Sequence, residues 1–457
     1  MNFFLNKKVG VLGLSRTGIS SIKFLKEKGF NVFGWDDNRK KLSKAKKNKL
    51  KIKILNKNNI KKMSFVLTSP GIPYSGKNKH IILKRAEKDK IEILNDIELF
   101  FRFNPEEKYI GVTGTNGKST TVCLLSHIFE KLKINNNLAG NIGKPVFDLK
   151  KYKKSFNILE ISSFQLEAMQ RTRFKVAVLL NISRDHIQRH ESFKKYIAEK
   201  IKIFNNQSEN DISIIGIDDK ITSSLVKKLK KKLYSRIITI SKKNKKADIC
   251  IKNKKLIINF KLKKKRILKK INVEQFKNFL GEHNYQNIAA AYAVVLSLGY
   301  FDWKKIEYSI KSFKALPHRL QKIRKISDIT FVNDSKATNI NATDEALKNF
   351  NNIYLILGGR LKEKNLQKLK KNFFRIKHVF LLGETKFLYQ KYLKNFLNCT
   401  IVKNLQEAVQ LSYNLAKKEM KKNSSSVVLL SPACSSLDEW SDFEDRGNAF
   451  INFVKKI

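Results

Sequence analysis

The residues best suited to chemistry form one short run in the first third of the chain. Seven consecutive positions read Gly114, Thr115, Asn116, Gly117, Lys118, Ser119 and Thr120. In such a run, placed after an apolar strand and before a helix, glycines let backbone N–H groups approach phosphate oxygens. Lys118 would meet the terminal phosphates of a nucleotide, and Ser119 could ligate Mg²⁺. The strict motif would have glycine at Val112, so the run is a variant phosphate loop.

A carboxylate follows the next apolar run. Glu160 comes directly after the run at 156–159. A carboxylate at this position can share Mg²⁺ with Ser119. The alternative is an ordinary solvent-facing acid at the end of a strand.

Three α/β patterns supply the elements that would position these residues. The first has an apolar run at 9–12, a glycine turn at 13–18, a helical pattern to Lys28 and a second apolar run ending in Asp36. This indicates a nucleotide-binding unit, although the glycine spacing is not GxGxxG. A further run at 64–68 leads into the rigid turn Ser69-Pro70-Gly71-Ile72-Pro73, where open α/β sheets place ligands.

Two more units follow the first. The second begins near Tyr109 and continues with apolar runs at 156–159 and 176–181, which indicate a mostly parallel sheet. The third shows runs at 329–333, 353–357, 379–382 and 427–430. We therefore expect an α/β fold with a Rossmann-like N-terminal domain (1–105), a central P-loop domain (106–315) and a Rossmann-like C-terminal domain (316–457). The lysine-rich stretch 219–270 is expected to form solvated hairpins or loops.

Composition narrows the function classes. No stretch resembles a signal peptide or a membrane span, and four cysteines without CxxC spacing indicate free thiols, so we expect a cytoplasmic protein. The net charge of +55 raises the possibility of nucleic-acid binding. However, 79 lysines against 15 arginines run through every segment, whereas base recognition relies on the arginine fork. We expect no specific nucleic-acid partner.

Several motifs resemble those of one family. The loop GTNGKST resembles that of Mur ligases and folylpolyglutamate synthases, both of which form an amide from ATP, a carboxylate and an amine. Three other stretches resemble the branch of the Mur ligase family that adds D-glutamate to UDP-N-acetylmuramoyl-L-alanine. They are Glu160–Glu167 (EISSFQLE), Asn333–Asn339 (NDSKATN) and Ser431–Asp438 (SPACSSLD), the last continuing to Gly447. A fourth stretch, Gly281–Asn287 (GEHNYQN), resembles the helix start that lies near the adenine in the family as a whole.

The resemblance implies a monomeric, ATP- and Mg²⁺-dependent ligase of peptidoglycan precursor synthesis that acts on two small substrates. It assigns ATP binding to residues 114–120 and to Asn287, Arg319 and Asp334. It assigns substrate binding to Arg16, Thr17, Asp36, Asp37, Ser69, Gly71, Asn141, Ser162, Gln165, Lys336, Thr338, Lys362, Ser436 and Phe443. It assigns catalytic roles to Lys118, Glu160, His186 and Lys200.

The resemblance also gives Lys200 an unusual chemical form. It implies a carbamylated side chain, whose carboxylate-like group would approach a second Mg²⁺ beside His186, with Ser119 and Glu160 at the first. An unmodified lysine would repel that metal. The alternative is an exposed structural lysine in a lysine-rich chain.

Three alternatives remain open at this point. Another Mur ligase or a folylpolyglutamate synthase would share the loop, but the SSFQLE, SKATN and SPACSS stretches oppose it. A nicotinamide-dependent dehydrogenase could use the first domain and would bind NADH. A basic nucleic-acid-stimulated ATPase could explain the charge, yet neither of these two explains the motifs of the third domain.

Overall fold

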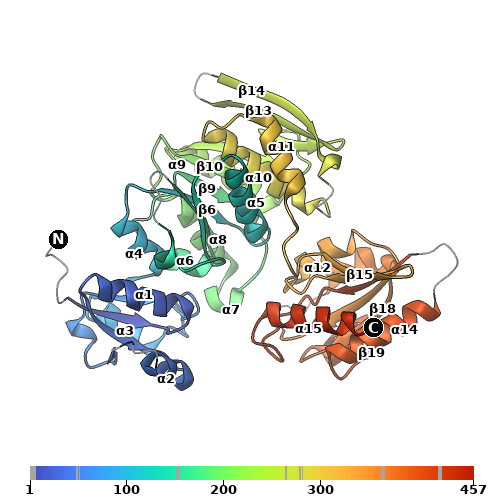
Figure 1. Ribbon diagram of the computed structural model, residues 1–457, viewed down its shortest axis with the longest axis horizontal. Helices are drawn as coiled ribbons and strands as arrows, with labels where there is room; N and C mark the ends of the chain where they lie inside the picture. The colour runs from blue at the N-terminus through green and yellow to red at the C-terminus, as the bar shows by residue number, and fades with distance from the viewer. Residues whose placement is uncertain are drawn as a thin grey trace. The chain divides into compact units, whose positions relative to one another are not determined.

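The computed structural model describes residues 7–47, 50, 52–150, 155–262, 265–276, 279, 281–361, 366–419 and 425–457. The chain folds into two compact units (Figure 1). One comprises Met1–Glu274 with Tyr285–Ile310, and the other Gln275–Asn284 with Lys311–Ile457. Over the described residues the first unit contains two sheets and the second unit one. The expected α/β class is confirmed, while the boundaries at 105 and 315 stay predictions.

The first sheet is parallel, with strand order β3-β2-β1-β4-β5. Its elements are β1 (Lys8–Leu12), α1 (Arg16–Glu27), β2 (Asn31–Trp35), α2 (Arg39–Lys47), β3 (Lys53–Ile54), β4 (Phe65–Thr68), α3 (Ile81–Lys88), β5 (Glu92–Leu94) and α4 (Asp96–Phe103). Because the strand order reverses between β1 and β4, ligands are expected beyond the carboxyl ends of these two strands. The predicted glycine turn follows β1 and the predicted Ser69–Pro73 turn follows β4.

The second sheet has the order β14-β13-β12-β11-β10-β9-β6-β8-β7 and is parallel from β7 through β12. Its strands are β6 (Lys108–Thr113), β7 (Asn136–Gly140), β8 (Phe156–Glu160), β9 (Val176–Leu179), β10 (Ile212–Gly216), β11 (Arg236–Ser241), β12 (Ile249–Lys252), β13 (Lys255–Leu262) and β14 (Lys265–Asn272). Its helices are α5 (Lys118–Lys131), α6 (Ser163–Glu167), α7 (Ile187–His190), α8 (Phe193–Ile201), α9 (Lys220–Lys232), α10 (His283–Ser297) and α11 (Trp303–Ser312). Strand β6 lies between β8 and β9, so the carboxyl ends of these three strands meet.

The lysine-rich stretch 219–270 is more regular than the sequence analysis expects. The expectation of a hairpin holds for the antiparallel pair β13 and β14. It is wrong for 220–241, where α9 and β11 extend the parallel sheet. Helix α9 buries Thr222, Val226 and Leu229, which recur at helical spacing among exposed lysines.

Helix α4 joins the two sheets of the first unit. The side-chain amide of Asn95 donates to the carbonyl of Gln165 at 2.6 Å. Glu98 is buried and accepts hydrogen bonds from the N–H groups of residues 170–172 and from the Thr172 hydroxyl. Burial alone would raise the pKa of Glu98, but these hydrogen bonds outweigh burial and lower its pKa. The carboxylate is therefore a charged, fully bonded link between the two sheets.

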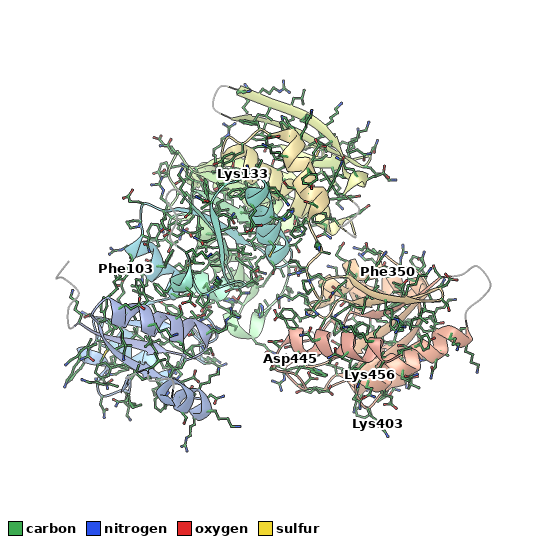
Figure 2. The ribbon with its side chains drawn as sticks, in the orientation of Figure 1. Phe103, Lys133, Phe350, Lys403, Asp445 and Lys456 are labelled. Atoms are coloured by element: carbon green, nitrogen blue, oxygen red, sulfur yellow. The ribbon has the colours of Figure 1, made fainter. Side chains whose placement is uncertain are left out.

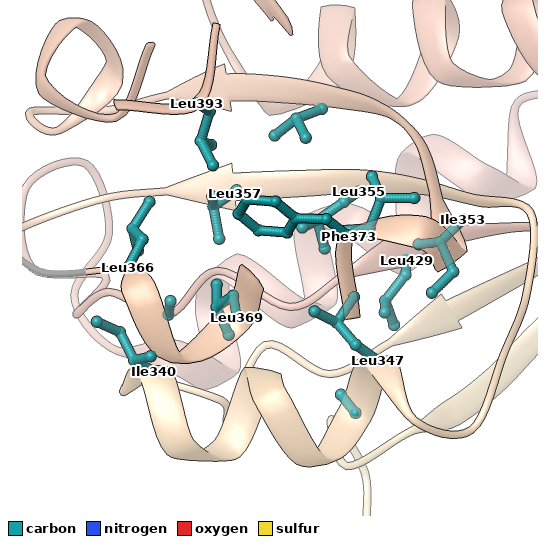
Figure 3. Packing of buried hydrophobic residues seen from close by; sticks show 14 of the residues in the cluster. Ile340, Leu347, Ile353, Leu355, Leu357, Leu366, Leu369, Phe373, Leu393 and Leu429 are labelled. Atoms are coloured by element: carbon teal, nitrogen blue, oxygen red, sulfur yellow. The ribbon is translucent and has the colours of Figure 1, made fainter. Parts of the chain in front are cut away.

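The third sheet has the order β15-β16-β20-β17-β18-β19, with only β15 antiparallel to its neighbour among the described strands. Its elements are β15 (Gln321–Ile326), β16 (Ile329–Asn333), α12 (Ile340–Leu347), β17 (Ile353–Gly358), β18 (Ile376–Leu382), α13 (Lys386–Leu393), β19 (Cys399–Ile401), α14 (Leu405–Lys418), β20 (Ser426–Leu430) and α15 (Phe443–Lys455). Leu355, Leu357 and Leu429 of the strands pack with Leu347 of α12 and with Phe373 (Figure 3). This core fixes the strand ends that carry the motifs of the second unit.

Lysines are spread over the surfaces of both units. Lys133 in the first unit and Lys403 and Lys456 in the second are exposed, and all three are labelled in Figure 2. This diffuse distribution fits the view that the charge is a property of the whole composition. Within the described part of the chain, no helix combines the length and apolar content needed to cross a bilayer.

Candidate active site

The glycine-rich run forms a tight loop between β6 and α5. Gly117 caps the start of α5 with φ +88°. A Cβ atom here would lie 2.4 Å from Oδ1 of Asn287, so only glycine fits between the loop and α10. The first N–H groups of a helix lack intrahelical acceptors, and the helix dipole favours anions there. The order of strand, loop and helix is the one that a phosphate site requires.

Side chains beyond β9 fix the shape of this loop. Oδ1 of Asn181 accepts the N–H of Asn116 at 2.9 Å, and its amide donates back to the Asn116 carbonyl. The Thr115 hydroxyl accepts the N–H of Ser183 and lies 3.0 Å from the hydroxyl of Tyr196. The Thr115 side chain therefore makes its hydrogen bonds within the protein. The sequence analysis did not identify Asn181 and Tyr196 as residues that shape the loop. Asn181 could have been found, because it is the polar last residue of the run recognised at 176–181.

Two lysines converge on one carbonyl of the loop. Nζ of Lys118 and Nζ of Lys200 each donate to the carbonyl of Gly114 at 2.9 Å. Lys200 is 2 % exposed. Burial, and then the charge of Lys118, lower the pKa of Lys200 well below its usual value. The lowered pKa favours the neutral amine form of Lys200, and the burial of this side chain differs from the exposed lysine of the alternative interpretation.

Glu160 occupies the strand end next to the loop. Strands β6 and β8 pair so that Val112 lies opposite Glu160. The Glu160 carboxylate is buried, and its Oε1 accepts a hydrogen bond from the side-chain amide of Asn141 at 3.2 Å. Its Oε2 is buried without a hydrogen-bond partner among the described residues. A buried carboxylate oxygen of this kind needs a ligand, and Mg²⁺ prefers such oxygens. The donor set of Glu160 and the buried Ser119 hydroxyl therefore fits a magnesium ion.

His186 lies in a strained turn at the start of α7. Its φ is +53°, an uncommon value for a residue other than glycine. Its side chain is exposed, its ring centroid lies 4.9 Å from that of Phe164, and its Nε2 lies 3.6 Å from Oδ2 of Asp185. Backbone strain persists where the surrounding structure over-determines it, often at functional sites.

The acids after β2 hold the first glycine turn. Asp36 is 7 % exposed, and its carboxylate accepts the N–H groups of Leu14 and Asn38. Asp37 is exposed and accepts hydrogen bonds from Trp35 at 2.8 Å and from His80. The hydrogen bond from Trp35 lowers the pKa of Asp37. Asp36 therefore shapes the turn, and of the two acids Asp37 is the one at the surface.

The remaining predicted residues of the first sheet border the switch point. The Ser69 hydroxyl donates to the carbonyl of Gly13 at 3.1 Å, which ties the turn after β4 to the turn after β1. Arg16 reaches the segment after β7, where it donates to the carbonyl of Gly143, two residues from Asn141. Thr17 is half-buried in the first turn of α1, and Gly71 is exposed.

Ser162 and Gln165 form a capping box at the start of α6. The Ser162 hydroxyl accepts the N–H of Gln165 at 3.2 Å, and Oε1 of Gln165 accepts the N–H of Ser162 at 2.9 Å. These contacts give both side chains a structural role, because together they cap the start of the helix. Their predicted contact with substrate stays a prediction.

In the second unit, Asp334 is buried at the end of β16. Its carboxylate accepts the N–H of Leu320 at 3.2 Å and the hydroxyl of Ser431 at 2.9 Å. Burial raises the pKa of Asp334 to about 7, although the hydrogen bond from Ser431 and the charge of Arg319 oppose the shift. A carboxyl with this pKa changes charge near neutral pH.

We expect Asp334→Asn to reduce the pH dependence of stability of the second unit. The pKa of Asp334 is raised from 3.8 to about 7, so its protonated form favours folding below pH 4, and this contribution is lost as the pH rises to about 7. Asparagine stays neutral, so between pH 5 and 8 the variant should lose on the order of 2 kcal/mol less unfolding free energy. Denaturant unfolding at both pH values measures the difference. Equal pH dependence in the two proteins would contradict the assignment.

Lys336 and Phe443 lie together in the second unit. Nζ of Lys336 lies 3.4 Å from the ring centroid of Phe443. Ser335 connects the same two segments, because its hydroxyl donates to the carbonyl of Phe443. Arg446, 1 % exposed, donates to Ser335 Oγ, to the Ser335 carbonyl and to the Cys434 carbonyl. Sequence reasoning noted the stretch that contains Arg446 but missed this role.

The remaining predicted substrate-binding residues of the second unit are Thr338, Ser436 and Lys362. The N–H of Thr338 donates to the carbonyl of Lys336, and Ser436 is buried. Lys362 lies outside the described residues. Gly358 and Gly359, which precede it, have φ values of +130° and +136°.

Models of one protein family match most of the chain. Residues 7–95 match "Mur ligase MurD-like, N-terminal domain", residues 112–295 match "Mur ligase middle domain", and residues 318–434 match "Mur ligase, glutamate ligase domain". The three matched ranges carry the first, second and third sheets in turn.

Similar proteins extend this likeness over the full length. UDP-N-acetylmuramoylalanine--D-glutamate ligase of Rickettsia prowazekii (strain Madrid E) is 36% identical over 461 residues, which cover 100% of this chain and 99% of that protein. The crystal structure of UDP-N-acetylmuramate-alanine ligase MurC from Thermotoga maritima has a TM-score of 0.58 at 17% identity and covers 98% of this chain and 99% of that one. MurF ligase from Thermotoga maritima in complex with ADP has a TM-score of 0.55 at 17% identity, with coverage of 88% and 97%. The two structures share the fold of this chain.

Proposed function

The chain belongs to the Mur ligase family, and on that premise we propose that it joins D-glutamate to UDP-N-acetylmuramoyl-L-alanine at the expense of ATP. The likeness to a D-glutamate ligase covers the whole length of both proteins. The proposed setting is peptidoglycan precursor synthesis in the cytoplasm, by a monomer without a nucleic-acid partner. In this reaction the γ-phosphoryl group moves to the substrate carboxylate and ADP leaves. The amine of D-glutamate then attacks the acyl carbon, loses a proton and releases phosphate.

The main observation behind this proposal is that Lys118 and Glu160 lie at the carboxyl ends of the neighbouring strands β6 and β8. The ammonium group of Lys118 lies on the phosphate loop, and Glu160 presents a buried, unpartnered oxygen one strand away. A carboxylate and a triphosphate repel each other, so a site that unites them needs cations. Lys118 supplies one fixed positive charge. Mg²⁺, held by Ser119 and Glu160, would neutralise phosphate charge when bound.

The remaining residues take supporting roles in the proposal. The N–H groups of residues 114–120 bind phosphate oxygens, and Asn287 lies against the loop as part of the nucleotide site. Arg16, Thr17, Asp37, Ser69 and Gly71 border the switch point where the uridine diphosphate portion is proposed to bind, and Asn141 is proposed to meet the muramoyl portion. In the second unit, Arg319 and Asp334 are proposed to contact ATP, and Lys336, Thr338, Lys362, Ser436 and Phe443 to bind D-glutamate.

Lys200 is proposed to act as a carbamate. The lowered pKa of the buried Lys200 favours the neutral amine, which can attack carbon dioxide with formation of an N–C bond and release of one proton. The product is an anion, and it would place a negative charge beside the ammonium group of Lys118, where the unmodified chain places two lysine amines on one carbonyl. The carbamate and His186 would together supply ligands for a second Mg²⁺.

An amino-acid panel tests the function. With the purified chain, ATP and Mg²⁺, we expect phosphate release only when UDP-N-acetylmuramoyl-L-alanine and D-glutamate are both present. L-glutamate, L-alanine and D-alanine serve as alternative amines, and each should give less than about one hundredth of the D-glutamate rate, because buried polar groups left unpaired by a wrong substrate discriminate strongly. Turnover with another amino acid in place of D-glutamate would overturn the assignment.

A further inference from the structure

Segment 186–191, which carries His186, is held between the two sheets of the first unit. It contains the four-residue helix α7, and both flanking residues, His186 and Glu191, have positive φ values of +53° and +63°. Neither is glycine. Two left-handed residues around one helical turn show that contacts from outside dictate the path of this segment.

On one side, buried groups of the second sheet anchor the segment. Nδ1 of His190 lies 3.1 Å from Oε1 of Glu167, and its Nε2 lies 2.9 Å from the hydroxyl of Ser163. His190 and Glu167 are each less than 10 % exposed. The ring of Phe164 lies against the rings of both His186 and His190. Helix α6 and segment 186–191 therefore hold a fixed position relative to each other.

On the other side, the segment contacts the loop after β4. The guanidinium of Arg189 donates to the carbonyls of Ile72 at 2.6 Å and of Pro70 and Gly71 at 3.5 Å. Oε1 of Glu191 accepts the N–H of Lys77 at 2.8 Å. Residues 70–72 and Lys77, in the segment after β4, are thus bonded through their backbone to side chains that lie three and five residues from His186.

We infer that Arg189 and Glu191 are positioning residues that couple the loop 69–77 to the placement of His186. The inference rests on the proposed function, in which this loop borders the uridine diphosphate site and His186 faces a metal. A movement of the loop on substrate binding must shift Arg189 or break its bonds to three carbonyls. Because α7 is only one turn long, that shift reaches His186 directly. Such coupling is reciprocal: a bound divalent ion strengthens substrate binding by the same factor as substrate strengthens ion binding.

The coupling is measured with Mn²⁺ as the probe ion. Its affinity for the full chain, with a non-hydrolysable ATP analogue, is determined from the electron paramagnetic resonance signal of the free ion, with and without UDP-N-acetylmuramoyl-L-alanine. We expect the substrate to tighten Mn²⁺ binding about tenfold, within the usual range for coupled sites. In Arg189→Met this factor should fall to about one, and calorimetry without metal should show weaker binding of the UDP substrate. Arg171→Met, the same change at an exposed arginine, should keep the factor.

A second variant guards against a folding defect. Glu191→Gly removes the bond to Lys77 and relieves the positive φ, so it should also reduce the coupling factor while the thermal unfolding midpoint is maintained. An unchanged factor in both folded variants would overturn the coupling alone. Failure of the unmodified chain to bind the UDP substrate at all would overturn the proposed function, and the coupling with it.

Discussion

Lys200→Ala is expected to lower kcat by about 10²- to 10³-fold, a loss typical of removing a preorganised charged group from an active site. Lys200 is fully buried beside the phosphate loop and donates to the Gly114 carbonyl. If the side chain acts as a carbamate, its removal takes away an anion that would hold a divalent ion near His186. Steady-state phosphate release with both substrates measures the loss. Lys194→Ala, at an exposed position of the same helix, is the matched control and should stay within about twofold, as surface changes usually do.

Chemical rescue separates the carbamate from an unmodified amine. Short carboxylic acids such as acetate should restore part of the activity of Lys200→Ala, because they supply the missing carboxylate, whereas short amines should not. Labelled bicarbonate should give a carbamate signal in the unmodified chain and none in the variant. Rescue by amines, or absence of both rescue and signal, would show that Lys200 works as an amine or only supports the fold.

The sequence alone was sufficient for the residues that follow buried parallel strands. Such strands are continuous apolar runs, so 110–112, 156–159 and 329–333 could be recognised, and the polar residue after each run could be placed at the ligand edge of its sheet. Strand β7 escaped this reasoning, since its Asn-rich sequence has low strand propensity. Its buried Asn137 is satisfied by Lys150 and Asn157 instead.

Contacts between distant segments could not be predicted in this way. Arg189 meets the loop at 70–72 only because two separate sheets pack together, and nothing in the local sequence around Arg189 signals that partner. Asp36 shows the same limit in another way. Its position after β2 predicts a substrate contact, which stays a prediction, but the local sequence did not reveal that its carboxylate closes the glycine turn by accepting the Leu14 N–H. Local sequence identifies which residue types stand at a site, whereas their partners depend on tertiary packing.

The second large effect is expected at Lys118. Lys118→Met keeps most of the apolar stem and removes the ammonium group, a charge-assisted contact of about 1.5 to 3 kcal/mol, so kcat should fall at least about 10- to 100-fold. Lys131→Met, at an exposed position near the other end of α5, is the control. A kcat within about twofold of the unmodified chain would remove Lys118 from the catalytic scheme.

A variant that carries both substitutions tests whether Lys118 and Lys200 act as one functional unit. Lys118 and Lys200 share the Gly114 carbonyl and influence each other's charge. Groups that act as a unit show strongly non-additive losses, because the first substitution already disables the unit. We therefore expect Lys118→Met with Lys200→Ala to be no slower than the slower single variant by more than about threefold. Fully multiplicative losses, measured by the same phosphate-release assay, would show instead that the two side chains serve separate steps.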